Sequence, residues 1–255
     1  MGTQPRILVG APPARDADIL ILGMAHAGAG SAPLLPLGSA LGDGVCLQAV
    51  RLPGRETRIG ELPHTDIESV ATEIADAITS IRFAGAIILF GHCLGALAMY
   101  EVASQLQQAR PQIQALVVSS QASPDLLERG ADHSALDSNA FWRMVGSLGG
   151  LPTELSANEE MRELLEPTLR ADWEVTETFR GSERPPLSVP IHAVWGRHDT
   201  IVNREQVAGW ANETSNRFTL HEVEGDHFLL SGPASGEVVR VLNAIAAHTS
   251  RCAAG

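Results

Sequence analysis

The sequence predicts an α/β fold with a mostly parallel central sheet flanked by helices, and three observations support this prediction. Short apolar runs alternate with stretches of helical periodicity, which is typical of a parallel sheet covered by helices. The run "AIILF" at residues 86–90 is apolar throughout, as expected of a central parallel strand. The length of 255 residues suits a single α/β domain, which commonly reaches roughly 250 residues.

The predicted elements alternate regularly over most of the chain. Strands are expected at residues 18–24, 45–52, 86–90, 114–120, 190–196 and 217–225. Helical spacing of apolar residues covers 66–82, the segment that begins at Leu94, and 234–250. Thr65 followed by Glu68 fits a capping box at the start of the first of these helices.

The interval 121–186 interrupts this alternation, because it contains helical patterns such as "NAFWRMVGSLGGLP" and no obvious strand. We expect a helical insertion that lies as a lid over the carboxyl edge of the sheet. Residues 1–120 and 187–255 then form the core. An ordinary helical subdomain that fills core space is the alternative.

The overall composition excludes several classes of protein. The net charge of −12 argues against nonspecific nucleic-acid binding, which needs a basic surface. No apolar run approaches the roughly 18 residues that span a bilayer, and the first residues are too short an apolar segment for a signal peptide. Three cysteines do not make a disulfide framework. We therefore expect a cytoplasmic monomer without membrane contact.

The segment "FGHCLGAL" at residues 90–97 places Cys93 at the centre of a G-x-C-x-G frame between a strand and a helix. This context is typical of a nucleophile on a sharp turn, where Gly91 and Gly95 remove side chains that would collide with neighbouring backbone. The helix N-terminus directs free N–H groups at the same point and favours a thiolate. We predict that Cys93 is a nucleophile and that Leu94 N–H is an oxyanion-hole donor. A buried structural cysteine is the alternative.

A thiol nucleophile needs a base and a group that orients the base. Asp199 in "VWGRHDTIV" and His227 in "VEGDHFLL" each follow a predicted strand. Their order after Cys93 is nucleophile, acid, histidine, as strand–turn–helix hydrolases require. Asp226 is a rival acid, but its adjacency to His227 makes the contact awkward. His92 is a rival base, but adjacent residues on a tight turn point apart.

A second oxyanion donor is expected from the loop "GMAHAGAGSA" at residues 23–32, after the first central strand. Its small residues let backbone N–H groups approach a reacting carbonyl. Ala27 is the first candidate and Gly28 the second. The loop has neither the Gly-Lys-Ser/Thr ending of a phosphate loop nor G-x-G-x-x-G, so no nucleotide cofactor is expected. No metal site is expected either.

Several sequence blocks together resemble those of type II thioesterases, the stand-alone α/β-hydrolases that accompany polyketide and nonribosomal peptide synthases. The blocks are "MAHAGAG", "VRLPGRETR", "FGHCLGALAMYE", "LGGLP", "LRADWEVTETF", "GRHDTIV" and "GDHFLL". The resemblance implies an α/β-hydrolase fold, a mobile lid, and an acyl substrate carried as a thioester on a carrier protein's phosphopantetheine arm. The triad positions match Cys93, Asp199 and His227. Cys93 stands where the family usually has serine.

The thiol suggests how the acyl group is handled. Transfer from a thioester to Cys93 forms another thioester, so the acyl group stays activated for hydrolysis, transfer or cyclisation. Three interpretations remain open: a natural thiol acyltransferase, an editing hydrolase that tolerates cysteine, and an engineered replacement of serine. A dienelactone-hydrolase-like esterase and a non-catalytic acyl-binding protein are the alternatives outside the family.

Two further groups of residues are weaker candidates. Arg51, Arg55 and Arg58 in "RLPGRETR" are candidates for docking an acidic carrier protein, with structural ion pairs as the alternative. Phe141, Trp142, Met144 and Trp173 are candidates for lining an acyl tunnel in the lid, and core packing explains them equally well.

Overall fold

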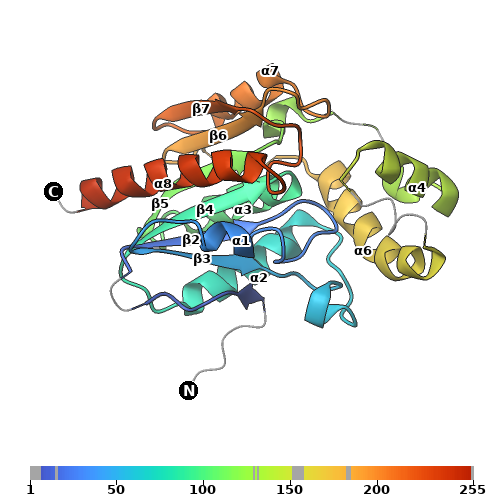
Figure 1. The fold of residues 1–255 in the computed structure, drawn as a ribbon, viewed down its shortest axis with the longest axis horizontal. Coiled ribbons are helices and arrows are strands. Elements are labelled where there is room, and N and C mark those ends of the chain that lie inside the picture. Colours follow the sequence, from blue (N-terminus) through green and yellow to red (C-terminus); the bar gives the residue numbers. More distant parts are fainter. Residues whose placement is uncertain are drawn as a thin grey trace.

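The structure is a computed structural model and describes residues 7–14, 17–128, 130, 132–150, 158–181 and 185–253. At its centre is a seven-stranded sheet in the order β1-β3-β2-β4-β5-β6-β7 (Figure 1). The first strand pairs antiparallel with β3, and every other neighbouring pair is parallel. The predicted mostly parallel α/β sheet is therefore confirmed.

The predicted strands are all present, with ends that shift by one or two residues. The strands are β1 (Leu8–Val9), β2 (Ile19–Met24), β3 (Val45–Val50), β4 (Ala86–His92), β5 (Ile113–Ser119), β6 (Ile191–Gly196) and β7 (Phe218–Val223). The helices are α1 (Leu35–Gly38), α2 (Ile67–Ser80), α3 (Leu94–Leu106), α4 (Ser138–Ser147), α6 (Glu159–Thr178), α7 (Arg204–Ala208) and α8 (Ala234–Ala253). The unpredicted β1 is too short to show a periodicity.

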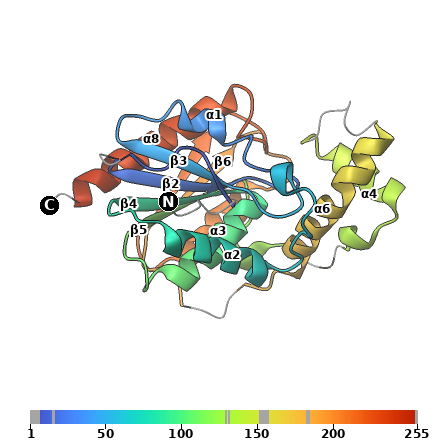
Figure 2. The same cartoon turned by 90° about the horizontal axis from the view of Figure 1, so that it is seen from below.

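Two hydrophobic cores lie on opposite faces of the sheet. Side chains of β2 alternate between them, with Leu20 and Leu22 in one core and Ile19 and Ile21 in the other. Figure 2 shows α2 and α3 on one side of the sheet and α1 and α8 on the other. Because both faces are covered, the central strands are apolar throughout, which explains the continuous apolar runs in the sequence.

The start of α2 differs from the prediction. Asp66 is the N-cap residue, and its carboxylate accepts a hydrogen bond of 2.8 Å from Ser69 N–H. The helix begins at Ile67, so Glu68 is one position too early to complete the capping box predicted from Thr65. That prediction was wrong because the helix starts one residue later, so the cap falls on Asp66 and satisfies the N–H group of Ser69.

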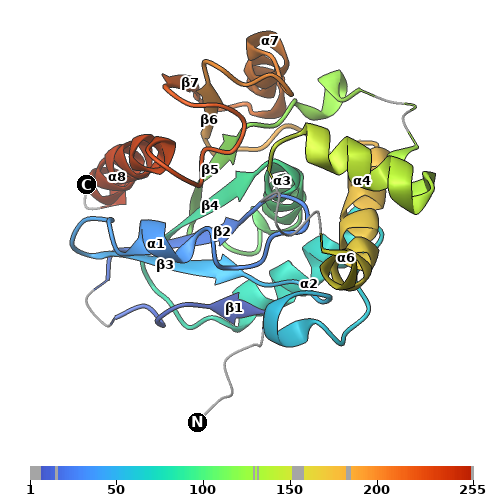
Figure 3. The ribbon, with the colours of Figure 1, turned by 45° about the vertical axis from the view of Figure 1, so that its right-hand side comes forward.

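Helices α4 and α6 lie between β5 and β6 in the chain and to one side of the sheet (Figure 3). They pack on each other through a separate small cluster that includes Phe141, Val145 and Leu169. The placement of α6 at the carboxyl edge follows from Asp172, which contacts the loop after β2. The domain boundaries at 121 and 186 remain a prediction, since parts of this interval lie outside the described residues.

Among the described residues, no helix combines the length and the apolar character needed to cross a membrane.

Candidate active site

Cys93 occupies the turn between β4 and α3 with φ 53° and ψ −122°. A positive φ is unusual for a residue with a side chain and marks backbone strain that the surroundings must hold. The turn is held by Cys93 N–H, which donates to Ser119 O at 2.9 Å. The thiol therefore stands, unpaired in any disulfide, at a strained and half-buried position.

The two glycines of the G-x-C-x-G frame make this turn sterically possible. A Cβ atom at Gly91 would lie 2.1 Å from Gly95 O, and one at Gly95 would lie 2.2 Å from Met24 O. Because both contacts are with backbone, no side-chain shift could relieve them. The close approach of α3 to the end of β2 brings the loop after β2 next to Cys93.

Leu94 is the first residue of α3, so its N–H group is one of the four that lack an intrahelical acceptor. Its side chain is buried in the core beneath the turn. The predicted donor role of Leu94 N–H is consistent with this position. The positive end of the helix dipole also favours negative charge on the Cys93 sulfur.

Asp199 and His227 follow the neighbouring strands β6 and β7 and meet at the carboxyl edge. His227 Nδ1 lies 3.0 Å from Asp199 Oδ2 and 3.2 Å from Oδ1. The Asp199 side chain is fully buried, and its Oδ1 accepts hydrogen bonds from the backbone N–H groups of Ile201 and Val202. Three donors thus hold the carboxylate in place, which orients the His227 ring.

The environment of His227 strongly favours its protonated form. Burial opposes the charge, but hydrogen bonds with Asp199 and Cys93 and the charges of both residues raise the pKa of His227 to about 10. The hydrogen bond with Cys93 joins all three predicted triad residues. The structure therefore brings together Cys93, His227 and Asp199 in the order that nucleophilic catalysis uses.

The rival acid and base take other positions. Asp226 is exposed, and its carboxylate accepts from Phe228 N–H at 2.8 Å instead of contacting the neighbouring histidine. His92 is fully buried, and its Nδ1 shares a hydrogen bond of 3.1 Å with Ser119 Oγ. Neither side chain competes with Asp199 or His227.

Two further histidines pack around the triad, and sequence reasoning did not select them. The His92 ring lies 5.7 Å from both the His227 ring and the His26 ring. Burial and the charge of His227 lower the pKa of His26 to about 4, against the opposing effect of Asp172. Burial, His26 and His227 together lower the pKa of His92 well below its usual value. Of these three rings, His227 is the one whose surroundings favour the positively charged form.

The loop after β2 forms a tight turn that presents the predicted donor Ala27. Ala29 N–H donates to His26 O at 3.1 Å, and Gly28 has φ 75°. These features match a turn that requires positive φ at its third residue. Gly28 N–H donates to Asp172 Oδ2 at 2.6 Å, so the second-choice donor is engaged elsewhere. Ala27 remains the candidate for the oxyanion hole.

The three arginines predicted to dock a carrier protein each form ion pairs within the chain. The pairs are Arg51 with Glu56, Arg55 with Asp172, and Arg58 with Glu61 and Glu73. Arg55 and Arg58 are buried, so their guanidinium groups are engaged inside the protein. This arrangement favours structural ion pairs over docking for these two residues. Docking on this loop stays a prediction.

The four lid residues predicted for an acyl tunnel belong to the cluster between α4 and α6. Phe141 and Trp142 are buried in it, and the Arg170 guanidinium lies 4.4 Å from the centre of the Phe141 ring. Met144 and Trp173 are partly exposed at its margin. Core packing therefore accounts for Phe141 and Trp142, whereas Met144 and Trp173 stay candidates for contact with an acyl chain.

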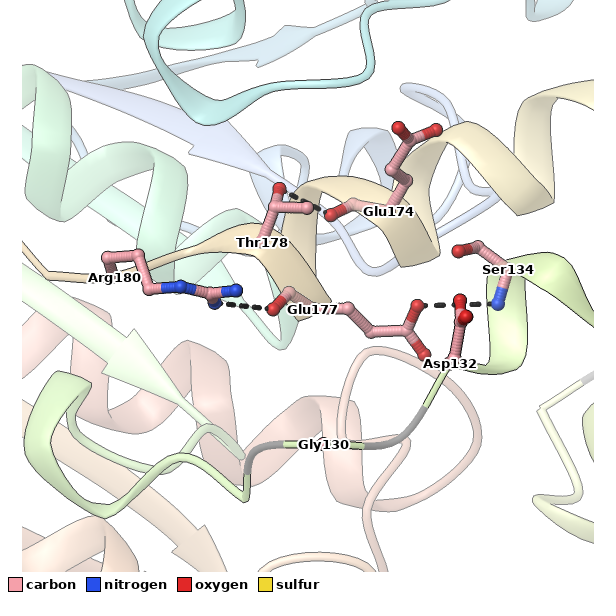
Figure 4. A pocket seen from close by; sticks show the side chains of 7 residues that line it. All are labelled: Gly130, Asp132, Ser134, Glu174, Glu177, Thr178 and Arg180. Carbon is pink, nitrogen blue, oxygen red and sulfur yellow. Dashed lines mark hydrogen bonds between the residues drawn. The ribbon is translucent and has the colours of Figure 1, made fainter.

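A pocket of about 310 Å³ lies at the C-terminal end of α6, and none of Cys93, Asp199 and His227 lines it (Figure 4). It is lined by Gly130, Asp132, Ser134, Glu174, Glu177, Thr178 and Arg180. Glu177 is already engaged, since it accepts hydrogen bonds from the backbone N–H and Nδ1 of His133. In the described part of the chain, this pocket included, no group of three or more His, Cys, Asp or Glu side chains is arranged to hold a metal ion.

Comparison with known proteins adds a family assignment to this geometry. The sequence profile of the family described as "Thioesterase domain" matches residues 21–247, which include all three residues of the triad. Linear gramicidin dehydrogenase LgrE of Brevibacillus parabrevis is 33% identical over 191 residues, which cover 73% of this chain and 72% of that protein.

Solved structures of thioesterases have a similar fold. The RedJ thioesterase from the prodiginine biosynthetic pathway in Streptomyces coelicolor has a TM-score of 0.83 and 32% identity, covering 92% of this chain and 95% of that chain. YbtT, a type II thioesterase from the yersiniabactin NRPS/PKS biosynthetic pathway, has a TM-score of 0.83 and 26% identity, covering 96% and 98%. These neighbours confirm the predicted α/β-hydrolase fold.

Proposed function

Because the chain belongs to the thioesterase domain family, we propose that it cleaves acyl thioesters and that Cys93 accepts the acyl group. The observation that carries the proposal is the position of Cys93, on a strained turn at the N-terminus of α3 and hydrogen-bonded with His227. A buried structural cysteine would need neither the strain nor the paired histidine.

Acylation begins with the His227 imidazolium beside the Cys93 thiolate. The sulfur attacks the substrate carbonyl carbon, and the carbonyl oxygen takes the negative charge. Leu94 N–H and Ala27 N–H stabilise this oxyanion, and losing one such donor typically costs about 10²–10³ in rate. When the tetrahedral intermediate collapses, the bond to the leaving thiol breaks and His227 donates its proton to that sulfur.

Deacylation uses the same histidine as a base. Once the sulfur carries an acyl group, the hydrogen bond and the charge of Cys93 no longer support a proton on His227. The pKa of His227 then falls from about 10, which suits a group that must accept a proton. His227 takes a proton from water or another acceptor, the acceptor oxygen or nitrogen attacks the acyl carbon, and the Cys93 thiolate leaves.

We further propose that the substrate is an acyl chain on the phosphopantetheine arm of a carrier protein from a polyketide or nonribosomal peptide synthase. YbtT, one of the similar structures, is a type II thioesterase from an NRPS/PKS biosynthetic pathway. Carrier proteins and this chain are both acidic, so contact between them needs a local basic surface or apolar contacts. The acyl-Cys93 thioester retains its activation, so amine and hydroxyl acceptors can compete with water.

The name of the Brevibacillus relative includes the word dehydrogenase, but the present chain favours a different chemistry. The sequence has no G-x-G-x-x-G fingerprint for a dinucleotide, and the loop after β2 forms the turn that presents Ala27. The triad geometry supports acyl transfer, and no observation favours hydride transfer.

The proposal is tested by intact-mass spectrometry after mixing the protein with the hexanoyl thioester of N-acetylcysteamine. The wild type should gain one hexanoyl group at Cys93, which then disappears as hexanoic acid forms. With an added amine, formation of the hexanoyl amide identifies transfer, whereas free acid alone identifies hydrolysis. The Cys93→Ala variant should show neither adduct nor turnover. The absence of both adduct and turnover in the wild type as well as in the variant would instead indicate a binding protein.

A further inference from the structure

The buried ion pair between Asp172 and Arg55 joins the lid helix α6 to the core. Arg55 Nη2 lies 2.8 Å from Asp172 Oδ1, and Nη1 lies 2.9 Å from Oδ2. The two side chains are only 5% and 2% exposed. A two-point contact of this kind is directional as well as strong, because the planar guanidinium matches the carboxylate.

The same pair also holds the turn that contains Ala27. Asp172 Oδ2 accepts from Gly28 N–H at 2.6 Å, and Arg55 Nη1 donates to Ala29 O at 3.0 Å. The turn is closed internally by Ala29 N–H, which donates to His26 O. The Asp172–Arg55 pair therefore supplies two of the three hydrogen bonds that we find on this turn.

These hydrogen bonds determine where the Ala27 N–H group points. In a trans peptide the N–H and C=O bonds point in opposite directions. His26 O points into the turn toward Ala29 N–H, so Ala27 N–H points out of it. The orientation of this donor thus depends on the turn, and the turn depends on the ion pair.

Glu56, the residue after Arg55, holds the C-terminal end of the loop that follows β2. Glu56 accepts hydrogen bonds from Ser31 N–H at 2.7 Å and from Ala32 N–H at 3.1 Å. Glu56 has φ 49°, so the chain adopts a strained conformation to make these contacts. The loop that holds Arg55 and Glu56 thus serves as a support for the loop that carries the oxyanion donor.

We propose that Asp172 is a positioning residue for the oxyanion hole, so that Ala27 N–H is correctly placed only while α6 is docked on the core. Arg55 has two roles in this arrangement. It orients the carboxylate, and its charge cancels a negative charge that would otherwise oppose the developing oxyanion. The inference rests on the proposed acylation of Cys93.

The test compares two reactions of the same thiol. Acylation by the hexanoyl thioester of N-acetylcysteamine passes through an oxyanion, whereas alkylation by iodoacetamide does not. We expect Asp172→Asn to slow single-turnover acylation of Cys93 by about 10- to 100-fold, the scale of a misplaced catalytic group. Alkylation of Cys93, followed by peptide mapping, should keep its wild-type rate.

Thr168→Val is the matched control, because Thr168 lies one turn earlier on α6 and donates to Gly54 O at 2.6 Å. This variant removes a buried contact between α6 and the core but no hydrogen bond to the turn, so acylation should fall much less than in Asp172→Asn and alkylation should keep its wild-type rate. Arg55→Lys, which keeps the charge but loses the two-point contact, should slow acylation less than Asp172→Asn does. If Asp172→Asn does not fold, the same comparison of acylation and alkylation is made with Arg55→Lys.

The proposal is overturned if acylation and alkylation fall together, if Thr168→Val slows acylation as much as Asp172→Asn does, or if both ion-pair variants acylate at the wild-type rate. A wild-type protein that is alkylated at Cys93 but never acylated contradicts the proposed function itself, and this inference with it. Wild-type acylation with unaffected variants contradicts the positioning role alone.

Discussion

His227 Nδ1 lies 3.0 Å from Asp199 Oδ2, a contact between loops that follow the neighbouring strands β7 and β6. Both side chains are almost completely buried, so the contact occurs in an environment where charges interact strongly. The proton on His227 is consequently stabilised by two partners, Asp199 on one side and Cys93 on the other. The protonation of His227 therefore depends on both Asp199 and Cys93.

Removal of either partner should lower the pKa of His227 from about 10. We expect this shift in both variants, because Cys93→Ala removes a hydrogen bond and a charge that favour the imidazolium, and Asp199→Asn removes a charge. NMR titration of the His227 ring measures it directly. The His192 titration is the internal control, since its lowered pKa depends on neither residue. An unchanged His227 titration in both variants would contradict this account.

The acid stability of the protein should depend partly on a second pair of histidines, on β6 and β7. His192 Nδ1 and His221 Nε2 lie 3.1 Å apart, and burial, followed by the charge of His221, lowers the pKa of His192 to about 4. Since the unfolded chain takes up this proton near pH 6.5 and the folded chain only near pH 4, stability should fall as the pH drops between these values.

Substitution of His192 by glutamine should therefore flatten the fall of the unfolding free energy between pH 6.5 and pH 4. Urea unfolding at several pH values measures the slope. His198→Gln is the matched control, because that histidine is largely exposed, and its slope should equal that of the wild type. Equal slopes for the His192 variant and the wild type would show that another group dominates acid unfolding.

The turn at Cys93 should not tolerate a methyl group at Gly95. In most helices a change from glycine to alanine stabilises by about 1 kcal/mol. At Gly95 the new Cβ would lie 2.2 Å from Met24 O, so we expect destabilisation of about 1–3 kcal/mol and loss of acylation. Gly236→Ala in α8 has open space and should instead stabilise. Thermal unfolding and the acylation assay measure both effects, and equal stability changes at the two sites would be inconsistent with the backbone contact.

The lid residues should separate into packing and substrate-contacting groups. Phe141 is fully buried, and its change to alanine should lower the unfolding free energy by about 3–5 kcal/mol, as large core truncations do. Met144→Ala, at the partly exposed margin, should cost less and should change the relative rates with hexanoyl and decanoyl thioesters. Urea unfolding and acylation kinetics give the two measurements. A Met144 variant with unchanged chain-length preference would remove this residue from the acyl site.

Much of the fold and the triad was predictable because the relevant signals are local. Burial on both faces of a parallel sheet produces continuous apolar runs, so the strands are visible in the sequence. The elbow needs glycines at fixed distances from Cys93, and that spacing is a property of a few consecutive residues. Asp199 and His227 were found because each directly follows a strand, and parallel strands end at one edge.

The rest depended on residues that meet only in three dimensions. Arg55 and Asp172 are 117 positions apart in the chain. Arg55 belongs to "VRLPGRETR" and Asp172 to "LRADWEVTETF", and no local pattern shows that these two segments meet. The sequence left two roles open for Arg55, docking of a carrier protein and a structural ion pair, and the packing of α6 buries it against the loop that carries Ala27. His26 and His92 likewise gather around His227 only because three strand ends meet.

The sequence by itself determined the order of strands and helices along the chain, the position of the thiol, and which carboxylate and histidine lie beside it. These follow from periodicity and from steric limits that act over short stretches of chain. Only the tertiary structure decided that Asp172 of the lid and Arg55 of the core would hold the oxyanion turn together. Hydrogen bonds between distant segments require a specific packing of α6, and no local pattern encodes that packing.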